Sequence, residues 1–247
     1  MIESENKTPA GQRVVIFFIA VLMLVSTLAL YAMVIVSDKN TRTDEAELQS
    51  VQDQFSELLS QHDVKMEAQR LELSSRYFDT FSPFKSEVRA FNATAVTELV
   101  TRDLVIGDGA EMVEGSSDYA AFYIGWLADE TIFDSSLGTD SSLKNPLPGG
   151  SMIDGWDQGI IGMKIGGVRE ITIPAELAYG ETARGEEGSS SYIPANSPLK
   201  FIVMLIDRPE DIPFPAGTID LCVKLYTDQY GEEMAQYYCE MYYDEGF

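Results

Sequence analysis

The chain is poor in the side chains that carry most enzyme chemistry. Its 247 residues include one histidine, His62, and two cysteines, Cys222 and Cys239. That supply is too small for a Cys/His zinc site or for a nucleophilic triad that depends on histidine. We therefore expect no bound metal and no cofactor.

Positive charge is also scarce. The chain has 17 Lys and Arg against 40 Asp and Glu, which gives a formal net charge of -23. A surface of this sign repels the phosphate backbone instead of releasing counterions from it. Nucleic acid is therefore excluded as an expected partner.

One long apolar run is present. Residues 14–36 carry no charge, and at about 1.5 Å per residue they are long enough to cross a hydrocarbon layer of about 30 Å. We predict an N-terminal segment at residues 1–13 and a transmembrane helix at 14–36; a cleaved signal peptide and a buried helix are the alternatives. Two basic residues flank the run on each side, so the positive-inside rule does not decide its orientation.

Residues 37–96 are predicted to form a helical stalk and a linker. Apolar residues recur there at steps of mostly three and four, at Leu48, Val51, Phe55, Leu58, Met66 and Leu73. Ser82-Pro83 is expected to end the helix. His62 falls on the same stripe and is interpreted as a tolerated polar residue. The stripe leaves open a homodimer through the stalk, and with it a purely structural membrane protein whose stalk drives assembly.

A folded domain is predicted at residues 97–209. Apolar or alternating runs at 104–106, 119–127, 168–173 and 199–206 are separated by Gly, Asp, Ser and Pro, which is typical of strands. A single short helix is expected around 154–163. The fold class is therefore α+β with an antiparallel sheet dominant.

Five short motifs follow one another in this domain. The first holds Tyr123, a glycine two residues later, and Phe133-Asp134-Ser-Ser. The second is Met152-Ile-Asp-Gly-Trp-Asp-Gln-Gly, and the third is Gly166-Gly-Val-Arg followed by Ile171-Thr-Ile-Pro. The last two are Ala178-Tyr-Gly and Ile193-Pro-Ala-Asn-Ser-Pro-Leu-Lys-Phe. In content and order they resemble the FKBP-type peptidyl-prolyl isomerases, over less than half of the chain.

The resemblance implies an antiparallel sheet wrapped around one short helix, with an apolar pocket between them for a prolyl side chain. By this resemblance the catalytic residues are Tyr123, Phe133, Asp134, Ile153, Trp156, Tyr179 and Phe201. Trp156 would form the floor, and the Ile153 N–H and the Tyr179 hydroxyl would bind substrate carbonyls. Asp134 would either take part at the rim or only hold a neighbour such as Tyr123. Trp126 lies away from these positions and is interpreted as a packing or exposed strand residue.

The sequence departs from the family pattern in two places. Where aromatics are frequent before Met152, this chain offers Leu143, which we predict to supply an apolar pocket wall. The loop at residues 180–192 is longer and more polar than the compact family version. Met152, Leu143, Tyr192 and Ile193 are the predicted substrate-binding residues. The expected ligands are proline-containing polypeptides, with an FK506-like or rapamycin-like macrolide left open.

Residues 210–247 form an acidic, tyrosine-rich extension outside the resemblance. A turn is expected at 214–217 and a helix at 230–243. Cys222 and Cys239 fit one disulfide outside the cytoplasm, and two free thiols inside it. We expect a single-pass membrane protein, held through residues 14–36, that assists folding from the extracytoplasmic side. The alternative is a non-catalytic FKBP-like chaperone or scaffold module.

Overall fold

The computed structural model describes residues 10–150 and 152–243, with side chains described from residue 45 onward. The chain divides into two compact units, Met1–His62 with Pro213–Phe247, and Asp63–Ile212. Among the residues described to their side chains, no helix combines the length and apolarity that a membrane span requires. The span predicted at 14–36 lies outside those residues.

A long helix, α1 (Ala10–Phe81), runs through both units. Within the described part of α1, ion pairs at three- and four-residue spacing, such as Glu67 with Arg70 and Glu72 with Arg76, support the helix. It ends one residue before Ser82-Pro83, as predicted, and continues into a short 3-10 helix, η1 (Ser82–Glu87). A second, η2 (Ala93–Ala95), is capped by Asn92, whose side chain accepts a hydrogen bond from the Thr94 N–H.

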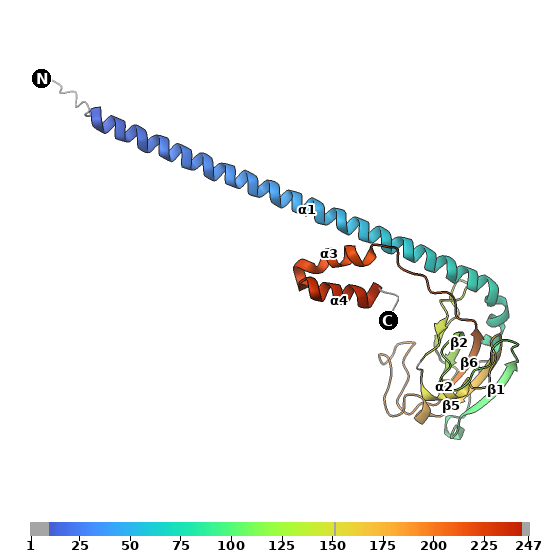
Figure 1. Ribbon diagram of the computed structural model, residues 1–247. Helices are drawn as coiled ribbons and strands as arrows, with labels where there is room; N and C mark the ends of the chain where they lie inside the picture. Colours follow the sequence, from blue (N-terminus) through green and yellow to red (C-terminus); the bar gives the residue numbers. More distant parts are fainter. Residues whose placement is uncertain (1–9, 151, 244–247) are drawn as a thin grey trace. The chain divides into compact units, whose positions relative to one another are not determined.

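The sheet of the second unit is antiparallel (Figure 1). Its strands are β1 (Val100–Val105), β2 (Ala120–Trp126), β3 (Ile132–Ser135), β4 (Leu147–Pro148), β5 (Val168–Ile173) and β6 (Leu199–Ile206). The strand order is β1-β5-β6-β2-β3, and β4 pairs with β2. Phe201 of β6 lies opposite both Gly125 and Ile171, so it occupies the centre of the sheet. The predicted α+β class with a dominant antiparallel sheet is confirmed.

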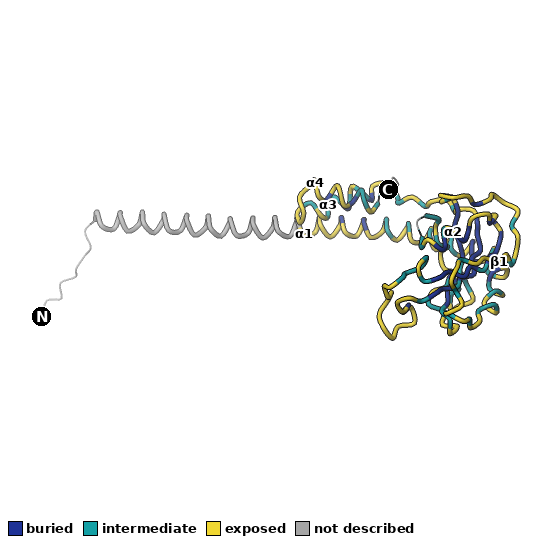
Figure 2. The backbone as a smooth tube through the Cα atoms, turned by 90° about the horizontal axis from the view of Figure 1, so that it is seen from below, coloured by how far each residue is buried: buried dark blue, intermediate teal, exposed yellow. Residues whose placement is uncertain are grey.

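Both faces of the sheet are buried, each in its own apolar cluster. Alternate residues of β2 and β6, such as Ala121, Phe201 and Val203, pack with α2 (Asp154–Gly159) on one face. Their neighbours Phe122 and Ile202 pack on the other face with residues of α1. Figure 2 shows buried residues gathered in the unit that carries α2 and β1.

The end of α1 supplies the cover of that second face. Leu73 and Phe81 are buried there, and Tyr77 packs beside them with its ring 5.9 Å from that of Phe122. Trp126 also lies in this cluster, 1 % exposed, and its indole N–H donates to the Arg89 carbonyl at 3.0 Å. Trp126 is therefore a packing residue. The part of α1 from residue 37 onward was predicted as a stalk, and this second layer was not predicted.

The C-terminal extension is a helical hairpin of α3 (Thr218–Tyr230) and α4 (Glu232–Tyr243). The predicted helix began at residue 230, and α3 was not predicted. Cys222 and Cys239 form a disulfide, so the free-thiol alternative is wrong. Both pack with Phe55 of α1 in the first unit. Phe55 of the predicted dimer stripe is thus occupied within the chain itself.

Candidate active site

Four aromatic side chains from four elements meet on the α2 face of the sheet. Tyr123 comes from β2, Phe133 from β3, Trp156 from α2 and Phe201 from β6. The Phe201 ring is the hub, with its centroid 5.4 Å from Trp156, 5.6 Å from Phe133 and 6.4 Å from Tyr123. Two of these pairs are edge-to-face, an arrangement that aromatic quadrupoles favour. Trp156 and Phe201 are buried, whereas Tyr123 and Phe133 are half-buried.

The short helix α2 places Trp156 at the base of this cluster. A Cβ added at Gly155 would lie 2.2 Å from the Ile173 side chain, so only glycine lets the helix approach β5 this closely. The indole N–H of Trp156 donates to the Tyr119 hydroxyl at 3.2 Å, which satisfies its one polar group. The Trp156 ring is thereby fixed in position and orientation. The helix ends at Gly159, four residues before the predicted end.

Arg169, a member of the third motif, anchors the C-terminal end of α2. Its guanidinium donates to the carbonyls of Gly159 and Ile161, each at 2.9 Å, and to the Asp103 carboxylate at 2.6 Å. The carbonyls that end a short helix have no partners within the helix, so a buried arginine is well suited to them. This role of Arg169 was not predicted from the sequence. The structure shows that it holds the element that carries Trp156.

Tyr123 and Asp134 interact directly at the edge of the cluster. The Tyr123 hydroxyl donates a hydrogen bond to the Asp134 carboxylate, and Lys144 lies 3.8 Å from the same carboxylate. Burial, helped by the hydrogen bond to Asp134, raises the pKa of Tyr123 above its ordinary value of 10. The phenol therefore remains neutral throughout the physiological range. Of the two roles considered for Asp134, participation at the rim or holding a neighbour such as Tyr123, this contact corresponds to the second.

Four of the remaining predicted residues surround the four rings, whereas Leu143 does not. Met152, Ile153 and Tyr179 are half-buried against the same cluster, and Ile193 is buried in it. The Ile153 carbonyl accepts from the N–H groups of Trp156 and Asp157, whereas no described residue accepts from the Ile153 N–H. The guanidinium of Arg184, from the loop after Tyr179, lies 5.1 Å from the Tyr179 ring centroid. Tyr192 is half-buried at the end of that exposed loop and is not among the residues packed against the cluster.

The prediction of Leu143 as a pocket wall is wrong. It is fully buried in the cluster on the opposite face of the sheet. Its N–H donates to the Ser74 hydroxyl at 2.8 Å, and its carbonyl accepts from Arg70 at 2.7 Å. Both partners belong to α1, so this helix draws Leu143 to the far side. Leu143 has no exposed surface with which to contact a substrate.

Gly125 is a site residue whose role the sequence analysis missed. A Cβ built there would lie 2.6 Å from the Phe133 ring and 2.7 Å from the Phe201 ring. The missing side chain thus leaves the space in which the two rings meet. The signal was visible, since a glycine inside an apolar strand often marks a close approach.

Comparison with known proteins identifies one family. Residues 110–206 match the FKBP-type peptidyl-prolyl cis-trans isomerase family. An FK506-binding protein of Neisseria meningitidis serogroup A is 44 % identical over 108 residues, which are 44 % of this chain and 94 % of that protein. The chloroplastic peptidyl-prolyl cis-trans isomerase FKBP13 of Arabidopsis thaliana is 40 % identical over 112 residues, which are 43 % of this chain and 53 % of that protein. The protein in the crystal structure of AtFKBP13 has 38 % sequence identity to this chain. The match covers 45 % of this chain and 93 % of that chain, with a TM-score of 0.38.

The chain belongs to the FKBP-type peptidyl-prolyl cis-trans isomerase family, because it spans nearly all of the Neisseria protein at this identity. It is accordingly an isomerase, and the family prediction is confirmed. This result favours an enzyme over a non-catalytic binding module.

Proposed function

We propose that this enzyme isomerises X-Pro bonds of polypeptides that fold at the outer face of a membrane, and that the four-ring cluster binds the proline. The observation that supports this site most directly is the meeting of Tyr123, Trp156 and Phe201 around one point of the sheet. Half-buried side chains border these rings, so a pyrrolidine ring could reach them from solvent.

The proposed reaction needs no nucleophile and no proton transfer. A peptide bond resists rotation by about 18–20 kcal/mol because twisting removes its resonance. The enzyme need only bind the twisted amide better than the planar one. Apolar aromatic walls grip the pyrrolidine ring and exclude water, which stabilises the polar planar amide more than the twisted one. The shortage of histidine and free cysteine is consistent with this mechanism.

Two donors are proposed to orient the substrate. The Ile153 N–H, which donates to no described residue, would bind one substrate carbonyl, and the Tyr179 hydroxyl another. Asp134 holds the Tyr123 phenol and so acts as a positioning residue at the rim. The same apolar walls and donors suit an FK506-like or rapamycin-like macrolide, which we propose as an inhibitor.

The reaction is tested by measuring prolyl isomerisation of a short X-Pro peptide with the full chain in detergent micelles. We expect acceleration by the parent protein and a loss of several-fold or more in kcat/KM for Tyr179→Phe. Tyr237→Phe, on the exposed face of α4, is the matched control and should leave kcat/KM unchanged. An inactive but folded parent would refute the proposed reaction. An unchanged Tyr179→Phe variant would remove that residue from the mechanism.

The location is a separate part of the proposal. It is supported by the uncharged run at residues 14–36 and by the Cys222–Cys239 disulfide, since such bonds persist mainly in oxidising compartments. The test is membrane fractionation of the full chain and of a variant that lacks residues 1–44, followed by protease treatment of intact cells. Membrane association that disappears in the variant, with digestion of the domain from outside, is the expected result. A full chain recovered in the soluble fraction would contradict anchoring.

A further inference from the structure

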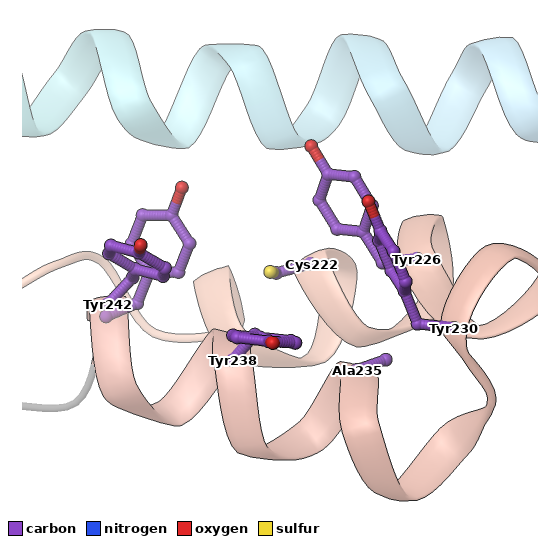
Figure 3. Close-up of a pocket in the computed structure, with 7 residues that line it drawn as sticks. Cys222, Tyr226, Tyr230, Ala235, Tyr238 and Tyr242 are labelled. Carbon is purple, nitrogen blue, oxygen red and sulfur yellow. The ribbon is translucent and has the colours of Figure 1, made fainter.

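The C-terminal hairpin carries a hollow lined almost entirely by tyrosine. Its volume is about 450 Å³, and its walls are Cys222, Tyr226, Tyr230, Ala235, Tyr238, Tyr242 and Tyr243. In Figure 3 the rings of Tyr226 and Tyr230, from α3, lie on one side of Cys222, and that of Tyr242, from α4, lies on the other. None of these residues belongs to the isomerase site.

The walls of this tyrosine hollow are fixed by covalent and packing contacts. The disulfide joins α3 to α4, Cys222 itself lines the hollow, and both cysteines are buried. Tyr243 packs edge-to-face on Phe55, with ring centroids 5.6 Å apart. By contrast, Tyr226 and Tyr238 are each 41 % exposed and Tyr242 is 67 % exposed. Aromatic surface held open in this way is typical of an interaction site.

The hollow offers hydrogen-bond donors without partners. Within the described part of the chain, the hydroxyls of Tyr226, Tyr238, Tyr242 and Tyr243 make no hydrogen bond, and the Tyr230 hydroxyl accepts one from Gln229. A matching ligand needs apolar rings for the tyrosine faces and acceptors for the hydroxyls. Proline-rich segments in the polyproline II conformation have both, since their carbonyls are unpaired and they carry few N–H groups.

The charge around the hollow selects among such segments. The hairpin carries five acidic residues, Asp220, Asp228, Glu232, Glu233 and Glu240. Its one basic residue, Lys224, is paired with Glu47 at 2.8 Å. The local potential is therefore negative and favours a cationic partner.

We propose that the tyrosine hollow is a second binding site, which holds a basic, proline-rich, extended segment of a client polypeptide. The identity of the client rests on the proposed function, whereas the hollow, its donors and its charge do not. Two separate sites on one chain would let a client remain bound while an X-Pro bond elsewhere in it is isomerised.

The direct test is a titration of the full chain in detergent micelles with a labelled peptide of four Lys-Pro-Pro repeats, followed by fluorescence anisotropy. Saturable binding is expected, with much weaker binding of Glu-Pro-Pro and Lys-Ala-Ser repeats. Equal binding of all three peptides would overturn the proposal, as would no binding by a folded parent.

Variants locate the site. Replacing Tyr226 and Tyr238 together by alanine should weaken binding by about tenfold or more. Replacing both by phenylalanine, which keeps the rings and removes the donors, should weaken it by about fivefold. Tyr237→Ala is the matched control, because Tyr237 is 58 % exposed on α4 and does not line the hollow. If the double phenylalanine variant folds, and if it and the double alanine variant both bind the Lys-Pro-Pro peptide as tightly as the parent protein does, the proposal fails.

Two further measurements separate this site from the isomerase site. The tyrosine variants should retain the parent kcat/KM on a short X-Pro peptide, and an excess of that peptide should not displace the Lys-Pro-Pro probe. Displacement would place the probe at the isomerase site and overturn the proposal. Sedimentation that shows a dimer lost in the alanine pair would identify a second copy of the chain as the occupant instead. An inactive parent that still binds the probe at the hollow would refute the isomerase proposal alone.

Discussion

Replacing Gly125 by alanine should damage both the stability and the activity of the enzyme. The added Cβ would approach the Phe133 ring to 2.6 Å and the Phe201 ring to 2.7 Å. Ordinary carbon contacts lie near 3.5–4.0 Å, so each ring must move by roughly 1 Å. Phe201 is 5 % exposed at the centre of the sheet and has little room to move, so Phe133 should be displaced toward solvent.

The expected cost follows from two opposing effects. Overpacking of a well-packed core typically costs about 1–3 kcal/mol. Loss of glycine from the unfolded chain returns about 0.4–1 kcal/mol. We therefore expect the free energy of unfolding to fall by about 1–2 kcal/mol. Because the Phe133 ring of the proposed site is displaced, kcat/KM on an X-Pro peptide should fall by about tenfold.

The assay combines denaturant unfolding with the isomerase measurement on Gly125→Ala, Phe133→Leu and the double variant. Leucine lacks the outer ring atoms that the new Cβ would meet, so the alanine should cost less stability in the Phe133→Leu background. Separate effects that simply add would refute the proposed collision with Phe133. An unchanged midpoint and unchanged kcat/KM in Gly125→Ala would refute the reasoning as a whole.

Three further predictions concern the supports of the site and the hairpin. Arg169→Gln should lower the free energy of unfolding by about 2–4 kcal/mol and reduce kcat/KM, because it unpairs buried carbonyls at the end of α2. The control Arg76→Gln, at an exposed position, should change the free energy of unfolding by less than about 0.5 kcal/mol. Equal effects of the two substitutions would contradict this role of Arg169. Cys222→Ser should destabilise the hairpin by about 3 kcal/mol, since the disulfide closes a loop with a separation of 17 residues, and an unchanged melting curve would contradict this. Burial alone would raise the pKa of Glu170, but the interactions with Lys200 and Arg102 outweigh burial and lower that pKa from 4.5. The ionised Glu170 therefore stabilises the fold above pH 4.5, and this stabilisation is lost as the pH falls through the pKa of the folded state. Acid titration should therefore show a shallower loss in Glu170→Gln, and parallel curves would refute the assignment.

The sheet was predictable where burial imposes a clear pattern. The observed β5 and β6 have the predicted bounds, and β2 is one residue shorter at each end. Most of β1 was missed, because its residues are almost all exposed and the strand carries polar side chains such as Arg102 and Asp103. An edge strand of this kind has little apolar pattern to recognise.

The errors at Leu143 and in the stalk have one physical cause. Residues 201–206 are apolar without alternation, which is typical of a strand buried on both faces, yet only one covering helix was assigned. The missing cover is the end of α1, which also binds the backbone of Leu143 through Arg70 and Ser74. Contacts between residues some 70 positions apart cannot be read from helical periodicity.

The layer that α1 adds to the sheet also determines how the enzyme could be cut free of its N-terminal part. Proteolysis before Asp63 would leave Leu73, Tyr77 and Phe81 in place, and the released fragment would keep both sheet faces covered. A fragment that begins at residue 97 would instead present a bare apolar face and should aggregate. A fragment of this isomerase that is to stay folded without the N-terminal part must therefore retain the last turns of α1.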